Sequence, residues 1–257
     1  MTDDAGLRLG VFLGVLGAAA LWEALAPARP RKLSRAWRWS NNLALVFLDS
    51  LLVRLLLPGI AIAAALWAQE AGWGLLNLAP IPAWLAFVAA VVALDFAIWA
   101  QHVAMHKVPI LWRLHRVHHA DPDFDATTGL RFHPIEILLS ALYKAAVAIA
   151  LGAPPEAVLV FEILLNAGSL FTHANARLPE AFDTAMRRVF VTPSMHRVHH
   201  SPERIETDSN YGFNLAVWDR WFGAYRESSA RGEIGLGRFG ARPDQRLDKL
   251  LIQPFKD

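Results

Sequence analysis

The sequence contains no cysteine. This absence excludes disulfide bonds, thiolate metal sites, iron–sulfur clusters and the covalent attachment of haem through Cys-x-x-Cys-His. Nor does any Gly-x-Gly-x-x-Gly begin a helix after a strand, so no flavin or dinucleotide site is indicated. Any metal must therefore be held by nitrogen and oxygen ligands, and electrons for redox chemistry must come from outside the chain.

Charged residues are also scarce, at 19% of the chain, and the net charge is only +2. Hydrophobic residues make up 54% of the chain, and the mean hydropathy is positive. This composition is too apolar for an ordinary soluble fold, so it predicts a membrane protein.

Apolar runs long enough to cross a bilayer alternate with short loops of contrasting charge. We expect about four to five membrane helices, near residues 7–26, 43–67, 84–104, 135–151 and 155–170. The acidic pair Asp3-Asp4, and a basic run that follows the first apolar segment, favour a retained anchor with its N-terminus outside over a cleaved signal peptide. The loops at 69–82 and 152–154 contain no Lys or Arg, which is typical of external loops.

Three charged residues lie deep in these predicted spans. Lys144 and Glu162 are each nine residues from Ala153, in the turn between the last two spans, so we expect their side chains to pair at the same depth. Asp95 lies two helical turns before His102 on the same helix face. The sequence leaves open whether Asp95 orients a metal ligand or makes a structural polar contact.

The remaining segments indicate a cap on the cytosolic side. Residues 177–195 are amphipathic, with Phe182, Met186 and Phe190 four apart. This pattern fits either a helix that lies on the membrane surface or an ordinary helix of the cap. The polar tail, residues 227–257, has no run of membrane length, and we expect it to pack as loops and a short helix against the cytosolic surface.

All ten histidines lie between residues 102 and 200. The pentapeptides at 115–119 and 196–200 both read His-Arg-Val-His-His, and in a helix the three rings of each share a face, so they can converge on one ion. A further pair, His102-x-x-x-His106, brings the count above what one tetrahedral zinc can use and predicts two metals. The topology, built from apolar runs and Lys/Arg positions, places every histidine on the cytosolic side.

These histidine motifs resemble those of the fatty acid hydroxylase/sterol desaturase superfamily of integral-membrane di-iron oxygenases. Two further stretches resemble the same superfamily: Arg131-Phe132-His133-Pro134-x-Glu136 and the segment from Asn210 to Tyr225. The resemblance covers residues 94–226. It implies an all-α, polytopic bundle with a cytosolic helical cap, two irons that zinc can replace in a purified protein, and O₂-dependent hydroxylation of a lipid C–H bond. Desaturation begins with the same hydrogen abstraction and is the alternative.

The resemblance also implies which residues act. Eight motif histidines are expected ligands, with the two isolated histidines as further ligands: His102, His106, His115, His118, His119, His196, His199 and His200, then His133 and His173. Asp121, Glu136 and Asp219 are candidates to orient ligands or handle protons, although each also fits a helix cap or a salt bridge. No cytochrome domain is attached, so we expect an external donor, a ferredoxin or a cytochrome b5-like protein with its reductase, to dock on the basic cytosolic surface.

Three other kinds of metal protein remain as alternatives. A metal transporter would place ionisable residues along the spans near the midplane, whereas these histidines gather at one end. A zinc hydrolase would need only about three protein ligands, and a haem transporter would show a Soret band. Nothing in the sequence indicates nucleic-acid binding, and the oligomeric state stays open.

We interpret residues 1–257 as one domain with three parts: N-terminal membrane helices (1–92), a histidine-bearing catalytic core (93–226) and the C-terminal tail (227–257). The chain shows neither a retention tail nor a cleaved leader, and no fused redox domain. These features favour a bacterial inner membrane, with the histidines on its cytoplasmic side.

Overall fold

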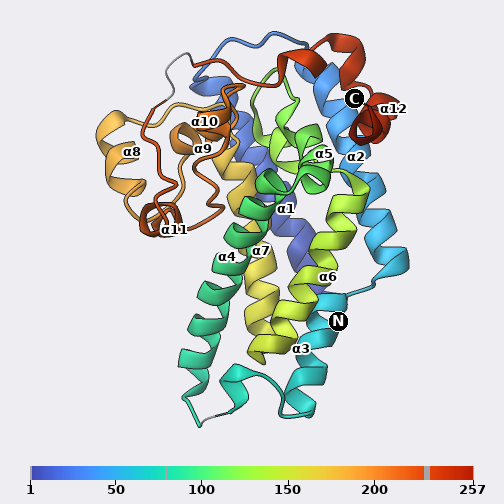
Figure 1. The fold of residues 1–257 in the computed structure, drawn as a ribbon, viewed down its shortest axis with the longest axis vertical. Coiled ribbons are helices and arrows are strands. Elements are labelled where there is room, and N and C mark those ends of the chain that lie inside the picture. The colour runs from blue at the N-terminus through green and yellow to red at the C-terminus, as the bar shows by residue number, and fades with distance from the viewer. Residues whose placement is uncertain (1, 79, 229–231, 257) are drawn as a thin grey trace.

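A computed structural model describes residues 2–78, 80–228 and 232–256, without the side chains of residues 2–4, so the expectation drawn from Asp3-Asp4 lies outside the described side chains. Long helices form a bundle, and shorter helices and loops cover one end of it (Figure 1). The bundle helices are α1 (Thr2–Leu25), α2 (Arg35–Leu56), α3 (Ile60–Glu70), α4 (Ala83–Lys107), α6 (Pro134–Leu151) and α7 (Pro155–Thr172). The helices of the cap are α5 (Pro109–His119), α8 (Glu180–Met186), α9 (Pro193–His199), α10 (Arg204–Thr207), α11 (Val217–Trp221) and α12 (Leu247–Ile252).

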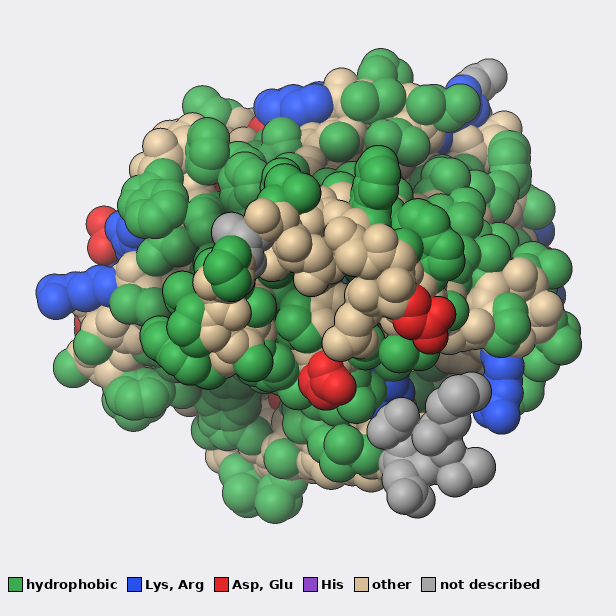
Figure 2. Space-filling model, turned by 90° about the horizontal axis from the view of Figure 1, so that it is seen from below, with side chains coloured by type: hydrophobic (Ala, Val, Ile, Leu, Met, Phe, Trp, Pro, Cys, Tyr) green, Lys and Arg blue, Asp and Glu red, His purple; other side chains and the backbone are tan. Residues whose placement is uncertain are grey.

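The bundle helices are long and apolar enough to cross a membrane. By length and composition the described residues offer five candidate spans, in α1, the α2–α3 pair, α4, α6 and α7. Figure 2 views the end of the bundle opposite the cap, and hydrophobic side chains cover most of it. The prediction of an all-α, polytopic membrane bundle with a cap is confirmed.

The second span differs from the prediction of one helix over residues 43–67. The chain breaks between α2 and α3, where Pro58 lacks an amide hydrogen and Gly59 takes a left-handed conformation with φ 61°. A proline removes a helix hydrogen bond, and glycine adopts positive φ without the penalty of a Cβ atom. Two helices offset from each other therefore replace the single one expected.

The predicted ion pair between α6 and α7 is present. Lys144 Nζ lies 2.7 Å from Glu162 Oε1, which confirms the pairing. A third charge joins it, since Arg8 Nη2 of α1 lies 2.7 Å from Glu162 Oε2. Glu162 therefore ties three helices together inside the apolar bundle.

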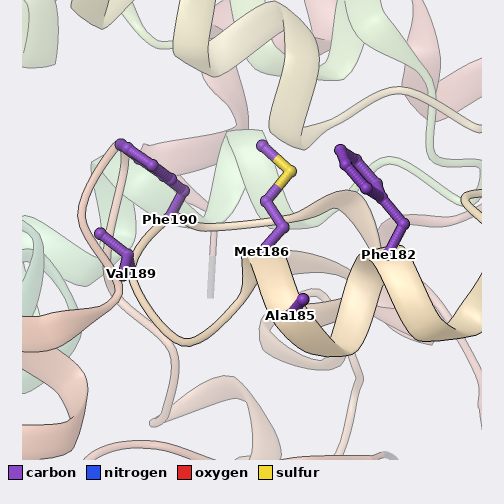
Figure 3. Close-up of a pocket in the computed structure, with 5 residues that line it drawn as sticks. All are labelled: Phe182, Ala185, Met186, Val189 and Phe190. Carbon is purple, nitrogen blue, oxygen red and sulfur yellow. The ribbon is translucent and has the colours of Figure 1, made fainter.

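The cap presents hydrophobic side chains on one face of α8. Phe182 and Met186 project from the same side of this helix, and Phe190 lies beside them (Figure 3). Phe182 and Phe190 are 57% and 49% exposed. The amphipathic pattern at 177–195 thus produces a helix of seven residues followed by a turn, with its apolar face uncovered.

The C-terminal tail packs on the cap as loops and short helices, as predicted. Leu250 of α12 is fully buried against Leu45 and Val117. Gln245 accepts a hydrogen bond from Arg131, and its amide donates to the backbone oxygen of Phe239. The tail therefore closes over α2 and α5, next to the histidines.

Candidate metal centre

Nine of the ten histidines converge in two buried groups, where the cap meets the ends of the membrane helices. Within each group the nearest ligand atoms all lie within 4.8 Å of one another. The five-histidine group contains His102 and His106 of α4, His115 and His119 of α5, and His199 of α9. The four-histidine group contains His118 of α5, His173 at the end of α7, and His196 and His200 of α9.

Each His-x-x-His-His motif divides between the two groups, which corrects the expectation that its three rings share one ion. His115 and His119 join the five-histidine group and His118 the other, whereas the second motif is distributed the opposite way. An α-helix turns about 100° per residue, so positions i and i+4 are about 40° apart and position i+3 lies about 60° to the other side of i. Each helix therefore presents one pair and one single ring to different points.

Hydrogen bonds at Nδ1 fix the tautomers of three rings in the five-histidine group. Nδ1 of His102 donates to the backbone oxygen of Tyr211 at 2.7 Å, and Nδ1 of His199 donates to that of Ser209 at 2.7 Å. Nδ1 of His115 donates to the carboxylate of Glu136 at 2.6 Å. A neutral imidazole that donates from one nitrogen carries a lone pair on the other. The Nε2 atom of His102 nevertheless lies 3.0 Å from that of His115 and 3.1 Å from that of His199.

The four-histidine group has the same arrangement around one central ring. His173 Nδ1 donates to the backbone oxygen of Ser169 at 2.7 Å. Its Nε2 lone pair faces three other Nε2 atoms at 3.0–3.1 Å. These belong to His118, His196 and His200, whose Nδ1 atoms are buried and have no partner among the described residues.

Lone pairs that face one another at such distances repel unless a cation lies between them. Two nitrogens that bind one ion at about 2.1 Å, about 90° apart, are about 3.0 Å from each other. The observed Nε2 separations match this value in both groups. The residues present therefore fit two metal ions, one in each group.

Burial keeps these rings neutral and available as ligands. It lowers the pKa of His199 to about 3 and that of His173 to about 4. It also holds the pKa well below the usual range in the other rings outside the membrane spans, namely His118, His119, His196 and His200. Near pH 7 the site thus offers unprotonated nitrogens, as metal binding requires.

His133, the tenth histidine, lies outside both groups, contrary to the prediction that it is a ligand. Its Nδ1 accepts a hydrogen bond from the backbone amide of Ile135, so the ring caps the first turn of α6. Its Nε2 lies 3.1 Å from the backbone oxygen of Leu251 in the tail. Both nitrogens are occupied by backbone groups, because His133 precedes Pro134 at the start of a helix and faces α12.

Of the three carboxylates singled out in the sequence, Glu136 alone contacts a histidine among the described residues. Asp121 binds Arg38 and Thr128, which fixes the loop after α5 to α2. Asp219 accepts hydrogen bonds from Trp99 Nε1 and from the amide of Tyr211. Since the backbone oxygen of Tyr211 in turn accepts from His102, Asp219 acts on that ring through the backbone.

Asp95 makes the structural contact that the sequence left open. Its carboxylate accepts hydrogen bonds from Asn214 Nδ2 at 2.9 Å and from Trp218 Nε1 at 2.8 Å. It therefore fastens α4 to α11 and to the segment before it, and among the described residues it makes no hydrogen bond to a histidine.

The tail contains a site element that sequence reasoning missed. The amides of Gly235 and Leu236 donate to the backbone oxygens of His200 and His119, at the ends of both histidine helices. Gly235 has φ 84°, and a Cβ there would lie 2.4 Å from the backbone oxygen of Asp121. The run Gly235–Gly240 reads Gly-x-Gly-x-x-Gly, but it follows no strand among the described residues and contains only a three-residue turn of 3-10 helix, Gly237–Phe239. Its spacing carried no signal for this capping role.

Four aromatic rings pack against the two histidine groups. Phe132 stacks on His118 at 4.6 Å between ring centroids, and Phe213 lies 5.0 Å from His102. Trp112 covers His106 and His119, at 4.9 and 5.4 Å. Phe124 covers the four-histidine group, 5.0 Å from His200 and 5.4 Å from His173.

A model of one protein family matches residues 87–224, the segment that holds both histidine groups and their supports. This family is called fatty acid hydroxylase. The chain belongs to the fatty acid hydroxylase family. Membership agrees with the donor set, since all nine converging ligands are imidazoles.

Curated relatives of this fatty acid hydroxylase family member act on several lipids. This chain is 29% identical to ornithine lipid hydroxylase OlsE of Rhizobium tropici, and the match covers 65% of this chain and 50% of that protein. It is 29% identical to human alkylglycerol monooxygenase over 57% of this chain and 32% of that enzyme. A cholesterol 25-hydroxylase-like protein of Danio rerio is 30% identical, with 50% and 51% covered. The matches thus span half or less of the first relatives, and no solved structure matches the chain.

Proposed function

We propose that this chain is a membrane-bound, O₂-dependent hydroxylase of lipids that carries two irons. The observation that supports this most directly is the convergence of imidazole lone pairs at two adjacent points, where the membrane helices end. The printed names of the relatives, ornithine lipid hydroxylase and alkylglycerol monooxygenase, support the lipid substrate.

The reaction would be RH + O₂ + 2e⁻ + 2H⁺ → ROH + H₂O. When bound, the two metals would supply the oxidising power needed to break an aliphatic C–H bond. The chain would hold them through His102, His106, His115, His119 and His199 in one group and His118, His173, His196 and His200 in the other.

Two aromatic rings support the proposal that the substrate approaches one face of the site. Phe132 lies at the start of α6 and stacks on His118, and it also lies 6.0 Å from His115 of the other group. It therefore borders both metal positions at the level of the membrane helices. Phe213 borders His102 and packs on the apolar core between α4 and α7. We propose that a lipid chain approaches along these two rings, which keep water from the reacting C–H bond.

We propose that the cap rests on the bilayer with its aromatic face. Trp221 and Phe222 are 73% and 59% exposed, and the Phe222 ring stacks on Phe96 and Trp99 of α4. Phe96 continues the exposed row Trp84, Val88 and Val92 of that helix. An apolar strip therefore runs from the membrane helix onto α11, where tryptophan is typical of the interface.

The positions of Lys and Arg support a cytoplasmic site. Arg29, Arg31 and Lys32 lie at the histidine end of the bundle, whereas the segment 69–78 at the other end has no basic residue. We propose a bacterial inner membrane as the location, supported by the likeness to the Rhizobium tropici protein.

Activity of purified protein in lipid nanodiscs tests the proposal. The iron-loaded protein is reduced with dithionite under anaerobic conditions in the presence of a bacterial lipid extract, the excess dithionite is removed, and O₂ is then admitted. We expect lipids that gain one oxygen atom, detected by mass spectrometry. Loss of two hydrogen atoms instead would identify a desaturase. The variant His173→Asn should be inactive, and product formation by zinc-loaded protein without reductant would contradict the oxygenase.

A further inference from the structure

The end of the molecule furthest from the bilayer carries a group of uncompensated basic side chains. Five basic side chains form no ion pair and no hydrogen bond among the described residues: those of Arg29, Arg31, Lys32, Arg177 and Arg197. Residues 26–29 and 175–177 are adjacent, because Pro27 and Ala176 form a β-bridge and Asn175 hydrogen-bonds to the backbone of Arg29. The segment that joins α1 to α2 passes over the top of the molecule in Figure 1, opposite the hydrophobic end of Figure 2.

Arg197 is the most confined of these charges. Its guanidinium lies over the Phe124 ring at 5.5 Å, and its Nε and Nη2 atoms are buried without a partner. Burial, together with repulsion from the nearby Arg29, lowers the pKa of Arg197 to about 10. The carboxylate of Asp183, the nearest opposing charge, is itself bound to Ser194. An anionic surface placed here would relieve this repulsion.

A small pocket of about 20 Å³ lies between the basic side chains and Phe124, with Arg29 and Lys32 in its lining. Asp123 also lines it, but both oxygens of this carboxylate accept hydrogen bonds from backbone amides, those of Lys32 and Leu33. The Phe124 ring also contacts the four-histidine group, with centroid distances of 5.0 Å to His200 and 5.4 Å to His173. A single aromatic layer thus separates this pocket from the histidines.

Four basic side chains near Trp112, the ring that packs on the five-histidine group, have partners. Trp112 is half-buried over the five-histidine group, but the neighbouring Lys107 and Arg204 both bind Asp208. Arg113 and Arg116 donate to backbone oxygens near the C-terminal end of the tail. Charge complementarity therefore favours the Phe124 side for a charged partner.

We propose that an acidic, one-electron donor protein docks over Arg29, Lys32 and Arg197, and that its electrons pass Phe124 into the four-histidine group. The proposal rests on the proposed function, which consumes two electrons and two protons for each hydroxylation. Two successive donors, each oxidised by one electron, supply the electrons. The position away from the bilayer fits a soluble protein partner better than lipid headgroups.

Anaerobic stopped-flow reduction of the iron-loaded protein in nanodiscs tests docking, with photoreduced [2Fe–2S] ferredoxin as the probe. The double variant Arg29→Glu/Lys32→Glu should lower the second-order rate on the order of tenfold at low salt, with the difference shrinking at high salt. The matched control Arg246→Glu/Lys249→Glu makes the same charge change on α12 and should leave the rate unchanged. Equal rates for the parent and the first variant would overturn the proposal, as would a rate set by the anionic lipid content of the disc.

The route past Phe124 is tested at saturating ferredoxin. Phe124→Leu should lose first-order reduction rate at unchanged iron content, Phe124→Tyr should keep it, and Trp112→Leu should not affect it. A rate lost in Trp112→Leu and kept in Phe124→Leu would place the route at the other group. Reduction by dithionite distinguishes a failure of docking from a failure of the proposed function. Hydroxylation with dithionite but none with ferredoxin would overturn the docking proposal alone. No hydroxylation with either reductant would overturn the proposed function.

Discussion

Glu136 Oε1 of α6 accepts a hydrogen bond of 2.6 Å from His115 Nδ1 of α5. The bond links a membrane helix to a ring of the five-histidine group and leaves the lone pair of His115 on Nε2, which faces Nε2 of His102. A carboxylate at this place also makes the imidazole a stronger ligand.

Removal of this carboxylate is expected to weaken metal binding in one group. Glu136→Ala should lower iron affinity roughly 10–100-fold, and Glu136→Gln less, because the amide oxygen still accepts the hydrogen bond. Competition with a chelator, followed by iron analysis, measures the effect. The exposed Glu156→Gln is the matched control. Unchanged affinity in Glu136→Ala would show that the hydrogen bond does not support His115.

His133 and His173 are expected to differ in metal content. His173→Asn should lose iron from the four-histidine group, whereas His133→Ala should retain the parent iron stoichiometry, since that ring caps a helix. Loss of the cap should lower stability by about 1 kcal/mol. Iron analysis and thermal unfolding in detergent check both outcomes, and an iron deficit in His133→Ala would restore the ligand role.

Removing Glu162 should destabilise the bundle more than removing Lys144. Glu162→Leu leaves the cations of Lys144 and Arg8 without their partner, whereas Lys144→Met leaves Glu162 paired with Arg8. A lost partner of a buried ion pair costs about 3–5 kcal/mol, which applies as an upper limit here because Arg8 is partly exposed. Thermal unfolding in detergent measures both, and an equal loss would mean that Arg8 adds nothing.

The metal-free protein should lose stability as the pH falls from about 6.5 toward 4. In the unfolded chain, histidines take up protons near their ordinary pKa of about 6.5. In the folded protein, burial lowers the pKa of His173 to about 4 and that of His199 to about 3. The unfolded state therefore binds more protons in this window, so stability rises with pH by up to about 1.4 kcal/mol per pH unit for each such group. Unfolding temperatures from pH 4.5 to 7 check this, and His173→Asn/His199→Asn should show a flatter slope. An unfolding temperature that rises on acidification would contradict it.

The absence of cysteine allows the position of the cap on the membrane to be measured without background labelling. Nitroxides at Trp221→Cys and Phe182→Cys should be reached by lipid-soluble oxygen more than by an aqueous nickel complex. Asp248→Cys on α12, which is an exposed polar site, should show the reverse. Equal aqueous access at all three sites would place the α8–α11 face in solvent.

Much of this architecture followed from local features of the sequence. Apolar runs located four of the five candidate spans to within three residues, because helix length is tied to bilayer thickness, whereas the second span, Arg35–Asn77, extends beyond the predicted residues 43–67 at both ends. Equal counting from the turn at Ala153 placed Lys144 opposite Glu162, since both helices leave that turn antiparallel. The break at Pro58 was readable from its chemistry, although it was missed within a continuous apolar run.

The sequence by itself determined that any metal would be held by nitrogen and oxygen, because cysteine is absent, and it predicted two metals, because the histidines are too many for one ion. Only the tertiary structure decided which ring joins which group, because this depends on how α5 and α9 are rotated about their axes relative to each other. The same holds for His133, which shares the chemistry of the other nine but faces the tail. Residue type sets what a side chain can bind, and only the packing of distant segments sets what it meets.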